Sequence, residues 1–436
     1  MPELVLCGSP PPATPPSAHL DSIDAALNTY AAPTLRSLKI DVSGVDRCDV
    51  PAYRISLWLR FASQRIAGKL RLRIDLKEDA RRYRDMKEEL ALPICDRATE
   101  IHLRFLPEVF LRPPPTGSFS ALTDLMISCG QMDGGELERA VSSPQCPRLR
   151  KLYIYVPNLV PVCDVSICSE SLECLDYNAM KTGKLEVNAP MLQEISVSHA
   201  AEACIIAPKL EMVRWSGEYN PGLHQFAVSG RHLQSLYIMH SSFLGMLISS
   251  TQLMKRYDSA KELIVSHGLY QEIVGYVTFL MEMDKLPICE SLIILLLANH
   301  HALAAMMFHL LRRCSCIRKL KLFLDQFSPP KKTSCSVSGC PCLLPENYRL
   351  DGITFDSLEE IGIKFFTGSG ELEQFMKLLL SKCNTATLKR VDITVPLAPV
   401  SSEIMEAVER IRSVCHPNSK TQFNVHAREA VKPLAP

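Results

Sequence analysis

The sequence lacks an excess of charge of either sign, and it lacks a long uninterrupted apolar run. Lysine and arginine together number 48, and aspartate and glutamate number 47. Dedicated nucleic-acid binders usually carry a basic excess, so this balance argues against a nucleic-acid partner. Glu290, Asn299 and several histidines interrupt the most apolar stretch, 286–311. A membrane span needs about 20 consecutive apolar residues, so we expect no membrane partner.

The sequence also lacks the marks of a secreted protein. It contains no Asn-x-Ser/Thr acceptor, and its first 20 residues are rich in proline rather than apolar, unlike a signal peptide. The 17 cysteines are spread along the chain, and several of them, such as Cys289 and Cys383, stand among apolar residues. This distribution favours buried reduced thiols over a disulfide framework. We therefore expect a cytoplasmic and/or nuclear protein.

Catalytic motifs are missing as well. The chain has no Gly-x-Ser-x-Gly elbow, no phosphate-binding loop and no His-Glu-x-x-His pair. We therefore expect a non-enzymatic protein with no catalytic residue and no cofactor. An enzyme is the weakest alternative, because it would need clustered acid and base residues that the spacing does not reveal.

A cysteine-rich segment raises a zinc alternative. It contains Cys314, Cys316, Cys335, Cys340 and Cys342. Structural zinc sites usually use Cys-x2–4-Cys pairs, whereas two of the spacings here are Cys-x-Cys. We therefore expect reduced loop cysteines and no metal.

A short repeated pattern, apolar-x-x-apolar-x-apolar, runs through nearly the whole chain. Its last three positions alternate as in a strand with one buried face. The copies begin at Leu35, Ala67, Ala98, Leu122, Leu149, Leu172, Leu192, Leu210, Leu233, Ala260, Cys289, Ile317, Leu358 and Leu388. From Leu122 to Ile317 they are 18 to 29 residues apart, close to the period of leucine-rich repeats.

One such repeat cannot fold alone. Its few apolar side chains contribute about 1.5–3 kcal/mol each when buried, whereas ordering its backbone costs about 1–2 kcal/mol per residue. Neighbouring copies must therefore stack and share a core, with parallel strands side by side. The sequence predicts an α/β leucine-rich-repeat solenoid with a curved parallel β-sheet and with helices or irregular segments on its outer face.

The spacing between copies predicts where the helices lie. Apolar residues recur at helical spacing in 303–311 and in 372–380, where Ser369 is placed as an N-cap. Asp133 is placed to cap a shorter helix carrying Leu137 and Val141. Only 18–20 residues separate Leu172, Leu192 and Leu210, so we expect extended segments there. We also expect a helix at 403–414 and strands at 388–395 and 421–426.

Composition divides the chain further. Residues 1–20 form a proline-rich tail that we expect to be disordered. The solenoid is expected over 21–327, followed by an insert loop rich in Cys and Pro over 328–350. The strand pattern resumes in 351–427, and 428–436 form a second tail.

Several motifs in order resemble one known family. They are Ala32–Leu38, Trp58–Ala62, Leu92–Cys95, Phe119–Leu125, Cys146–Leu152, Ala207–Glu211, Cys340–Cys342, Asp356–Glu360 and Val414–Asn418. Over about residues 21–427 the chain resembles plant F-box/leucine-rich-repeat/FBD-domain proteins of the grass type, and its region 351–427 is FBD-like.

The resemblance implies a role in protein binding. In that family an N-terminal F-box binds the Skp-type adaptor of a ubiquitin ligase, and the repeats hold the substrate. The sequence departs from the family here, because no segment before Leu35 reads as an F-box. We expect a protein-recognition module resembling the substrate-binding part of such a receptor, with the adaptor as a partner only if an F-box lies upstream. The alternative is a stand-alone binding or decoy protein with no link to the ligase.

The candidate partner-binding residues are strand side chains that alternate with the apolar set and so face away from the core. Tyrosine and arginine are enriched at protein interfaces, and an unknown protein partner is expected on the concave sheet. The candidates are Tyr153, Tyr155, Asp176, Arg214, Tyr237, Lys319, Lys321 and Phe323.

Overall fold

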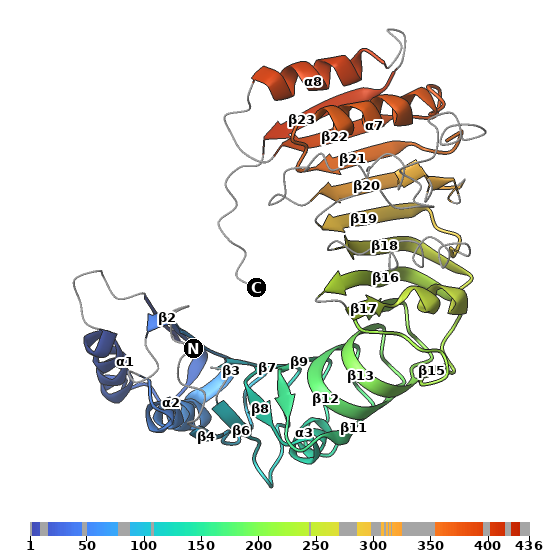
Figure 1. Ribbon diagram of the computed structural model, residues 1–436. Coiled ribbons are helices and arrows are strands. Elements are labelled where there is room, and N and C mark those ends of the chain that lie inside the picture. The colour runs from blue at the N-terminus through green and yellow to red at the C-terminus, as the bar shows by residue number, and fades with distance from the viewer. Residues whose placement is uncertain are drawn as a thin grey trace. The chain divides into compact units, whose positions relative to one another are not determined.

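The structure is a computed structural model of the whole chain (Figure 1). It describes residues 2–8, 16–45, 50–76, 88–105, 109–243, 246–269, 286–297, 307–308, 311–312, 314, 316–324, 354–395, 402–414 and 420–427. The chain divides into two compact units, Met1–Leu210 with Pro221–Gly230 (unit 1) and Glu211–Asn220 with Arg231–Pro436 (unit 2). This division falls inside 21–327, where we expected one array, and the expected domain boundaries stay a prediction. The expected insert at 328–350 and tail at 428–436 lie outside the described residues.

Each unit is an α/β structure dominated by parallel strands, with few helices among the described residues. In unit 1 the main strands pair in chain order, skipping some shorter strands between them, and each of these pairings is parallel. They are β1 (Glu3–Gly8), β2 (Leu35–Val45), β3 (Ile66–Leu76), β5 (Glu100–Arg104), β7 (Asp124–Ser128), β9 (Lys151–Val156), β12 (Cys174–Asn188) and β13 (Glu194–Ile206).

The predicted apolar triplets form the core of both units. Nearly all of their side chains are buried, from Leu35 through Ile393. The exception is Ala67, which is half-buried. The pairing of β2 with β3 slips by one residue here, so that Ile66 takes the buried position opposite Leu35. The assignment of Ala67 to the core was therefore wrong by one position.

The expected disorder of residues 1–20 is wrong for two segments. Glu3–Gly8 forms β1, in which Leu4 and Leu6 pair in register with Leu38 and Ile40 of β2. Helix α1 begins at Pro16 and ends at Thr29, and it buries Leu20, Ile23 and Leu27 at helical spacing. Proline content suggested disorder, but the apolar residues of β1 lie in the sheet, and those of α1 are buried in a helix that contacts α2.

Unit 1 contains a second parallel sheet that the sequence analysis did not predict. Its strands follow the main strands along the chain and pair in the order β4, β6, β8 and β10. They span Glu88–Ala91, Val109–Arg112, Gln131–Met132 and Asn158–Leu159. The extended segments expected between Leu172 and Leu210 are confirmed, because they form the second half of β12 and the end of β13. The second half of β12 pairs with β11 (Cys163–Cys168), and the end of β13 pairs with β15 (His224–Ala227).

The helices of unit 1 are held by specific polar contacts. Helix α2 spans Ala52–Arg65, and its Trp58 donates a 2.7 Å hydrogen bond from Nε1 to Asp24 of α1. Helix α3 spans Gly134–Val141. The predicted cap is confirmed, since the Asp133 carboxylate accepts a 2.8 Å hydrogen bond from the backbone N–H of Glu136.

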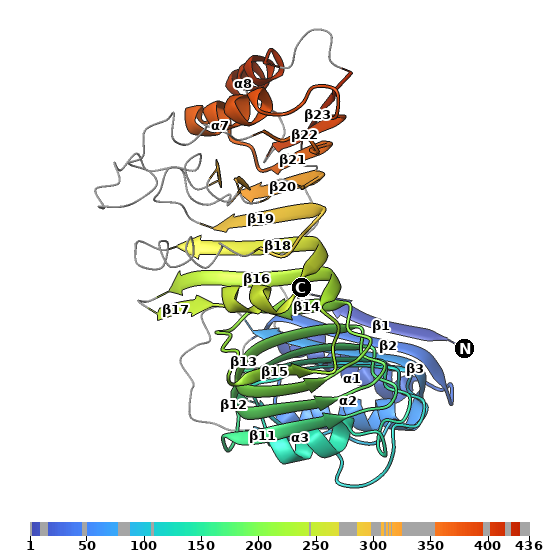
Figure 2. The ribbon, with the colours of Figure 1, turned by 90° about the vertical axis from the view of Figure 1, so that its right-hand side faces the viewer.

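The strands of unit 2 also pair in chain order and in parallel, apart from β17, which runs antiparallel to β16. Figure 2 shows β18, β19 and β20 side by side. The strands are β14 (Met212–Trp215), β16 (His232–Phe243), β17 (Met246–Ser249), β18 (Ser259–Leu269), β19 (Ser291–Leu297), β20 (Lys319–Leu324), β21 (Glu360–Lys364), β22 (Arg390–Val395) and β23 (Gln422–Ala427). A 3-10 helix, η3, spans Thr251–Arg256.

Two helices expected in unit 2 are confirmed. Helix α7 spans Gly370–Ser381 and buries the predicted apolar face, and α8 spans Ser402–Arg412. Ser369 occupies the N-cap position of α7, but its side chain makes no capping hydrogen bond, so the capping contact was wrong. Of the helix expected at 303–311, the structure describes Met307, Phe308 and Leu311, which are helical and buried.

Candidate functional site

The predicted partner-binding residues all lie on the sheet face opposite the core. Each is half-buried or exposed, whereas the residues on either side of it in the strand turn inward, most of them buried. Tyr153, Tyr155 and Asp176 belong to unit 1. The other five, Arg214, Tyr237, Lys319, Lys321 and Phe323, belong to unit 2.

In unit 1 the three predicted residues form one cluster. Asp176 lies opposite Tyr153 in the pairing of β12 with β9, and its carboxylate accepts a 2.7 Å hydrogen bond from the Tyr155 hydroxyl. Burial, together with the nearby Cys174 thiol, raises the pKa of Tyr153 to about 12. The Tyr153 phenol is therefore a neutral hydrogen-bonding group at neutral pH.

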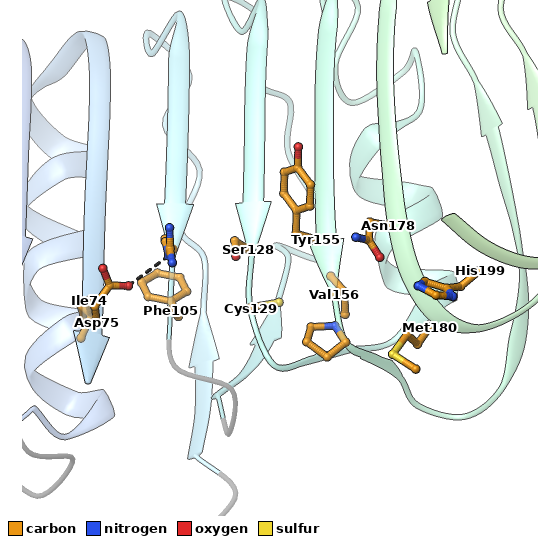
Figure 3. A pocket seen from close by; sticks show the side chains of 12 residues that line it. Ile74, Asp75, Phe105, Ser128, Cys129, Tyr155, Val156, Asn178, Met180 and His199 are labelled. Carbon is orange, nitrogen blue, oxygen red and sulfur yellow. Dashed lines mark ion pairs between the residues drawn. The ribbon is translucent and has the colours of Figure 1, made fainter. Parts of the chain in front are cut away.

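The cluster borders a groove of about 510 Å³, which lies at the carboxyl ends of four neighbouring strands and at irregular points within two further strands (Figure 3). The groove draws its walls from β3, β5, β7, β9, β12 and β13 and from the residues that follow some of these strands. Its apolar lining is Ile74, Phe105, Cys129, Val156, Pro157 and Met180. Its polar lining is Asp75, Arg104, Ser128, Tyr155, Asn178 and His199.

The charged end of the groove is internally paired. Asp75 on β3 forms ion pairs with Arg104 at 3.0 Å and with Arg73 at 2.5 Å. This end of the groove therefore presents a carboxylate and a guanidinium that are paired with each other.

The thiol in the groove is protonated and unreactive near neutral pH. Cys129 follows β7 and is buried, and its thiol lies 3.6 Å from the backbone carbonyl oxygen of Gln131, to which it donates a hydrogen bond. Burial raises the pKa of the Cys129 thiol to about 12. Since the thiolate is the nucleophile, this cysteine is an apolar wall of the groove.

The far end of the groove depends on an irregularity in β12. Its pairing with β13 shifts register between Asn178 and Thr182, and Lys181 has a positive φ of 65°. The buried Thr182 hydroxyl bonds to the Tyr177 hydroxyl and to the Ala179 carbonyl, both at 2.8 Å. These buried contacts fix the bend, which leaves Met180 exposed at the groove.

His199 completes the groove from β13, also with a positive φ, of 64°. Of these lining residues, Tyr155 was predicted from the sequence, whereas Asp75, Arg104, Asn178 and His199 were not. A signal for three of them was present, because Asp75 and Arg104 lie at or near the ends of predicted strands and Asn178 continues one. Carboxyl ends of parallel strands lie along one edge of a sheet, which brings such residues together.

In unit 2 the five predicted residues are spread over three strands. The Arg214 guanidinium lies over the Tyr237 ring, 5.0 Å from its centroid. Lys364 Nζ lies 4.6 Å from the centroid of Phe323. Lys321 lies opposite Ile293 on one side and Gly362 on the other.

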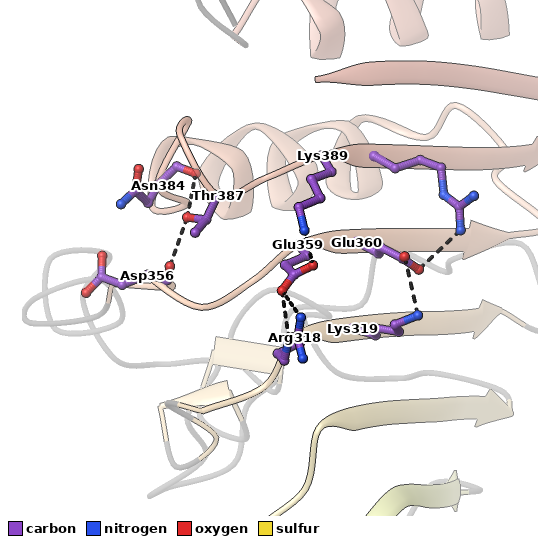
Figure 4. Close-up of polar contacts among 9 residues, drawn as sticks. Arg318, Lys319, Asp356, Glu359, Glu360, Asn384, Thr387 and Lys389 are labelled. Atoms are coloured by element: carbon purple, nitrogen blue, oxygen red, sulfur yellow. Dashed lines mark hydrogen bonds and ion pairs between the residues drawn. The ribbon is translucent and has the colours of Figure 1, made fainter. Parts of the chain in front are cut away.

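An ion-pair ladder ties together β20, β21 and β22 near their amino ends (Figure 4). Glu359 bonds to Lys389 at 2.6 Å and to Arg318 at 2.6 Å, and these contacts lower its pKa. Glu360 pairs with Lys319 at 3.3 Å and with Arg390 at 3.2 Å. Lys319 was predicted as a partner-binding residue, and the structure shows that its ammonium group also joins β20 to β21 through Glu360.

The described part of the chain contains no group of His, Cys, Asp and Glu side chains arranged to hold a metal ion. Cys335, Cys340 and Cys342 lie outside the described residues. The described cysteines are all free thiols. Among the helices that the structure describes, none is long and apolar enough to cross a membrane.

No protein-family model matches the chain, and no curated protein matches it.

Proposed function

We propose that this chain is a non-enzymatic protein-recognition module, built as a leucine-rich-repeat solenoid whose curved parallel sheet binds another protein on its outward face. The sequence resemblance to F-box/FBD proteins suggests the substrate-binding part of a ubiquitin-ligase receptor. The long runs of parallel strands in both units are compatible with this architecture.

The groove of unit 1 is the observation that carries the proposal. Binding pockets are commonly about 300–1,000 Å³, with apolar walls and a few polar groups that fix orientation. The groove, at about 510 Å³, has this composition. Phe105 and Met180 provide apolar contact, while Tyr155, Asn178 and His199 provide hydrogen-bonding groups, so it suits one or two large side chains of a bound polypeptide.

The chemistry of the groove favours binding over catalysis. Its carboxylate, Asp75, is held in ion pairs with two arginines, and its thiol, Cys129, has a pKa of about 12. The carboxylate is occupied by its arginine partners. A thiol nucleophile needs to be ionised, and the Cys129 thiol does not meet this requirement near neutral pH.

The test compares the proteins captured from cell extract by the wild-type chain and by a Tyr155→Ala/His199→Ala variant. We expect a specific partner to be captured by the wild type and lost from the variant. Tyr53→Ala is the matched control, since Tyr53 is an exposed tyrosine of unit 1 on α2, away from the sheet face. Equal capture by all three proteins contradicts a recognition role for the groove.

The ligase role is tested separately with a purified Skp-type adaptor. Co-purification of the adaptor with the full-length protein supports a receptor role. Failure to bind, with the protein's start confirmed by sequencing the 5′ end of the transcript, favours the alternative of a stand-alone or decoy binding protein.

A further inference from the structure

One strand of unit 2 is apolar on both of its faces. β19 reads Ser-Leu-Ile-Ile-Leu-Leu-Leu over Ser291–Leu297. Leu292, Ile294 and Leu296 face the core and are at most 2% exposed, whereas Ile293 and Leu295 face outward and are half-buried. Unbroken apolar strands are typical of sheets covered on both faces. A sheet that is open to water on one face normally places polar residues there.

The neighbouring strands extend this apolar surface. Ile293 lies opposite Ile264 of β18, which lies opposite Tyr237 of β16. Leu295 lies opposite Phe323 of β20. We call the six outward-facing residues of this surface the apolar stripe: Tyr237, Met239, Ile264, Ile293, Leu295 and Phe323. A contiguous apolar patch on a protein surface commonly marks an interaction site.

Three cations border the apolar stripe. Arg214 lies over Tyr237, Lys364 lies over Phe323, and Lys321 lies opposite Ile293. None of the three forms an ion pair with a carboxylate of the described residues, whereas nearby Lys319 and Arg390 both pair with Glu360. Glu262 precedes Ile264 by two residues on β18, and it lies opposite Ser235 and Ser291. The border of the stripe therefore carries a net positive charge.

We propose that the apolar stripe binds a segment of another protein that presents large apolar side chains flanked by aspartate or glutamate. The apolar side chains cover Ile293 and Leu295, and the carboxylates meet Lys321, Lys364 and Arg214. A second copy of this chain fits poorly, because two stripes placed face to face would bring their cations together. The inference deepens the proposed function by giving unit 2 a partner chemistry of its own.

The experiment selects short random peptides, displayed on phage, against the immobilised full-length chain. Binding of the selected peptides is then measured by fluorescence anisotropy. We expect sequences rich in Leu, Ile or Phe together with Asp or Glu. An Ile293→Ser/Leu295→Ser variant is expected to bind them about tenfold or more weakly, as for central residues of an interface. Both residues face outward, so the core of the sheet is unchanged.

A charge reversal tests the electrostatic half of the inference. In a Lys321→Glu/Lys364→Glu variant the preference is expected to change from acidic peptides to the same peptides with lysine in place of the acids. Thr394→Ala is the control, since Thr394 lies on the same face, opposite Lys364 and outside the stripe. It is expected to bind as the wild type does.

Several outcomes overturn the inference. One is an unchanged charge preference in the reversed variant, and another is the absence of any enriched acidic, apolar peptide. If the selected peptides fail to bind only the Tyr155→Ala/His199→Ala variant, recognition takes place in the groove of unit 1. That result contradicts the inference about the apolar stripe but supports the proposed function. Stripe-dependent binding to phosphatidylserine vesicles alone, or stripe-dependent self-association alone, assigns the surface to a different occupant.

Discussion

The Tyr155 hydroxyl donates a 2.7 Å hydrogen bond to the Asp176 carboxylate, and this bond joins β9 to β12 on the outward face of unit 1. Tyr155 lies opposite Asn178 in the strand pairing, and Asp176 lies opposite Tyr153. The bond therefore runs diagonally between the strands, over a separation that long side chains can span. It holds the Tyr155 ring at the wall of the groove.

A double-mutant cycle on this pair tests whether the bond exists in solution. Tyr155→Phe removes the hydroxyl and keeps the ring, and Asp176→Ala removes the acceptor. We expect the two changes to couple by about 0.5–1.5 kcal/mol in the free energy of unfolding, as is usual for a hydrogen bond. Urea unfolding of the wild type, the single variants and the double variant gives the coupling. Effects that simply add would show that the two side chains do not interact.

Gly68 on β3 allows a close approach of two strands. A Cβ atom at this position would lie 2.2 Å from the backbone carbonyl oxygen of Arg36 on β2, where the strand pairing slips. Backbone cannot move aside as a flexible side chain can, so Gly68→Ala is expected to destabilise the protein by about 2 kcal/mol or more. Thermal or urea unfolding measures the loss.

Gly230→Ala is the matched control, because a Cβ atom at Gly230 meets nothing within 4 Å. We expect this substitution to change the free energy of unfolding by no more than about 0.5 kcal/mol. If both substitutions change the free energy of unfolding by the same small amount, β2 and β3 can move apart at Gly68 without loss of stability.

Glu373 links α7 to α8. Its carboxylate accepts 2.9 Å hydrogen bonds from Arg410 of α8 and forms a 2.7 Å ion pair with Lys377 of α7. These contacts lower its pKa from 4.5 to about 2. A depressed pKa in the folded state stabilises the fold above the unfolded pKa, and this stabilisation is lost as the pH falls through the folded pKa.

Glu373→Gln is therefore expected to destabilise α8 at pH 7, by about 1 kcal/mol after allowance for solvent screening. The difference from the wild type should shrink between about pH 4.5 and pH 2. Hydrogen exchange of the α8 amides at pH 7, together with urea unfolding across this pH range, measures both effects. A difference that grows as the pH falls would contradict the assigned partners.

The sequence predicted the strands well because their pattern is local. In β9, Leu152 and Ile154 alternate with Tyr153 and Tyr155, and this alternation alone distinguishes the buried face from the open one. Strand β1 escaped prediction because it stands next to a proline-rich stretch, whose composition suggested disorder. The strands of the second sheet were missed because a segment as short as Gln131–Met132 carries no periodic signal.

The groove was harder to predict than the strands. Its lining extends from Ile74 to His199, so it depends on the register of six strands. Tyr155 was identified because it alternates with core residues. His199 was not, because it lies where β13 leaves regular alternation with a positive φ. The stripe residues Ile293 and Leu295 were missed because a continuous apolar run hides which residues face outward.

Cysteine reactivity offers a direct test of the proposal that the groove binds and does not catalyse. Burial raises the pKa of Cys129 to about 12, so little thiolate forms near neutral pH. Cys168 is exposed at the end of β11. We expect iodoacetamide at pH 7.5 to modify Cys168 much faster than Cys129, because the thiolate is the reacting species. Mass spectrometry of digested samples over time gives both rates.

Cys95 and Cys146 serve as buried controls, since burial also raises the pKa of each thiol to about 12. Cys129 is expected to react as slowly as they do. If Cys129 reacts as fast as Cys168 while both controls stay unmodified, the groove holds an accessible, ionised thiol. A nucleophile at that position would turn the groove into a candidate active site, and the non-enzymatic proposal would then have to be abandoned.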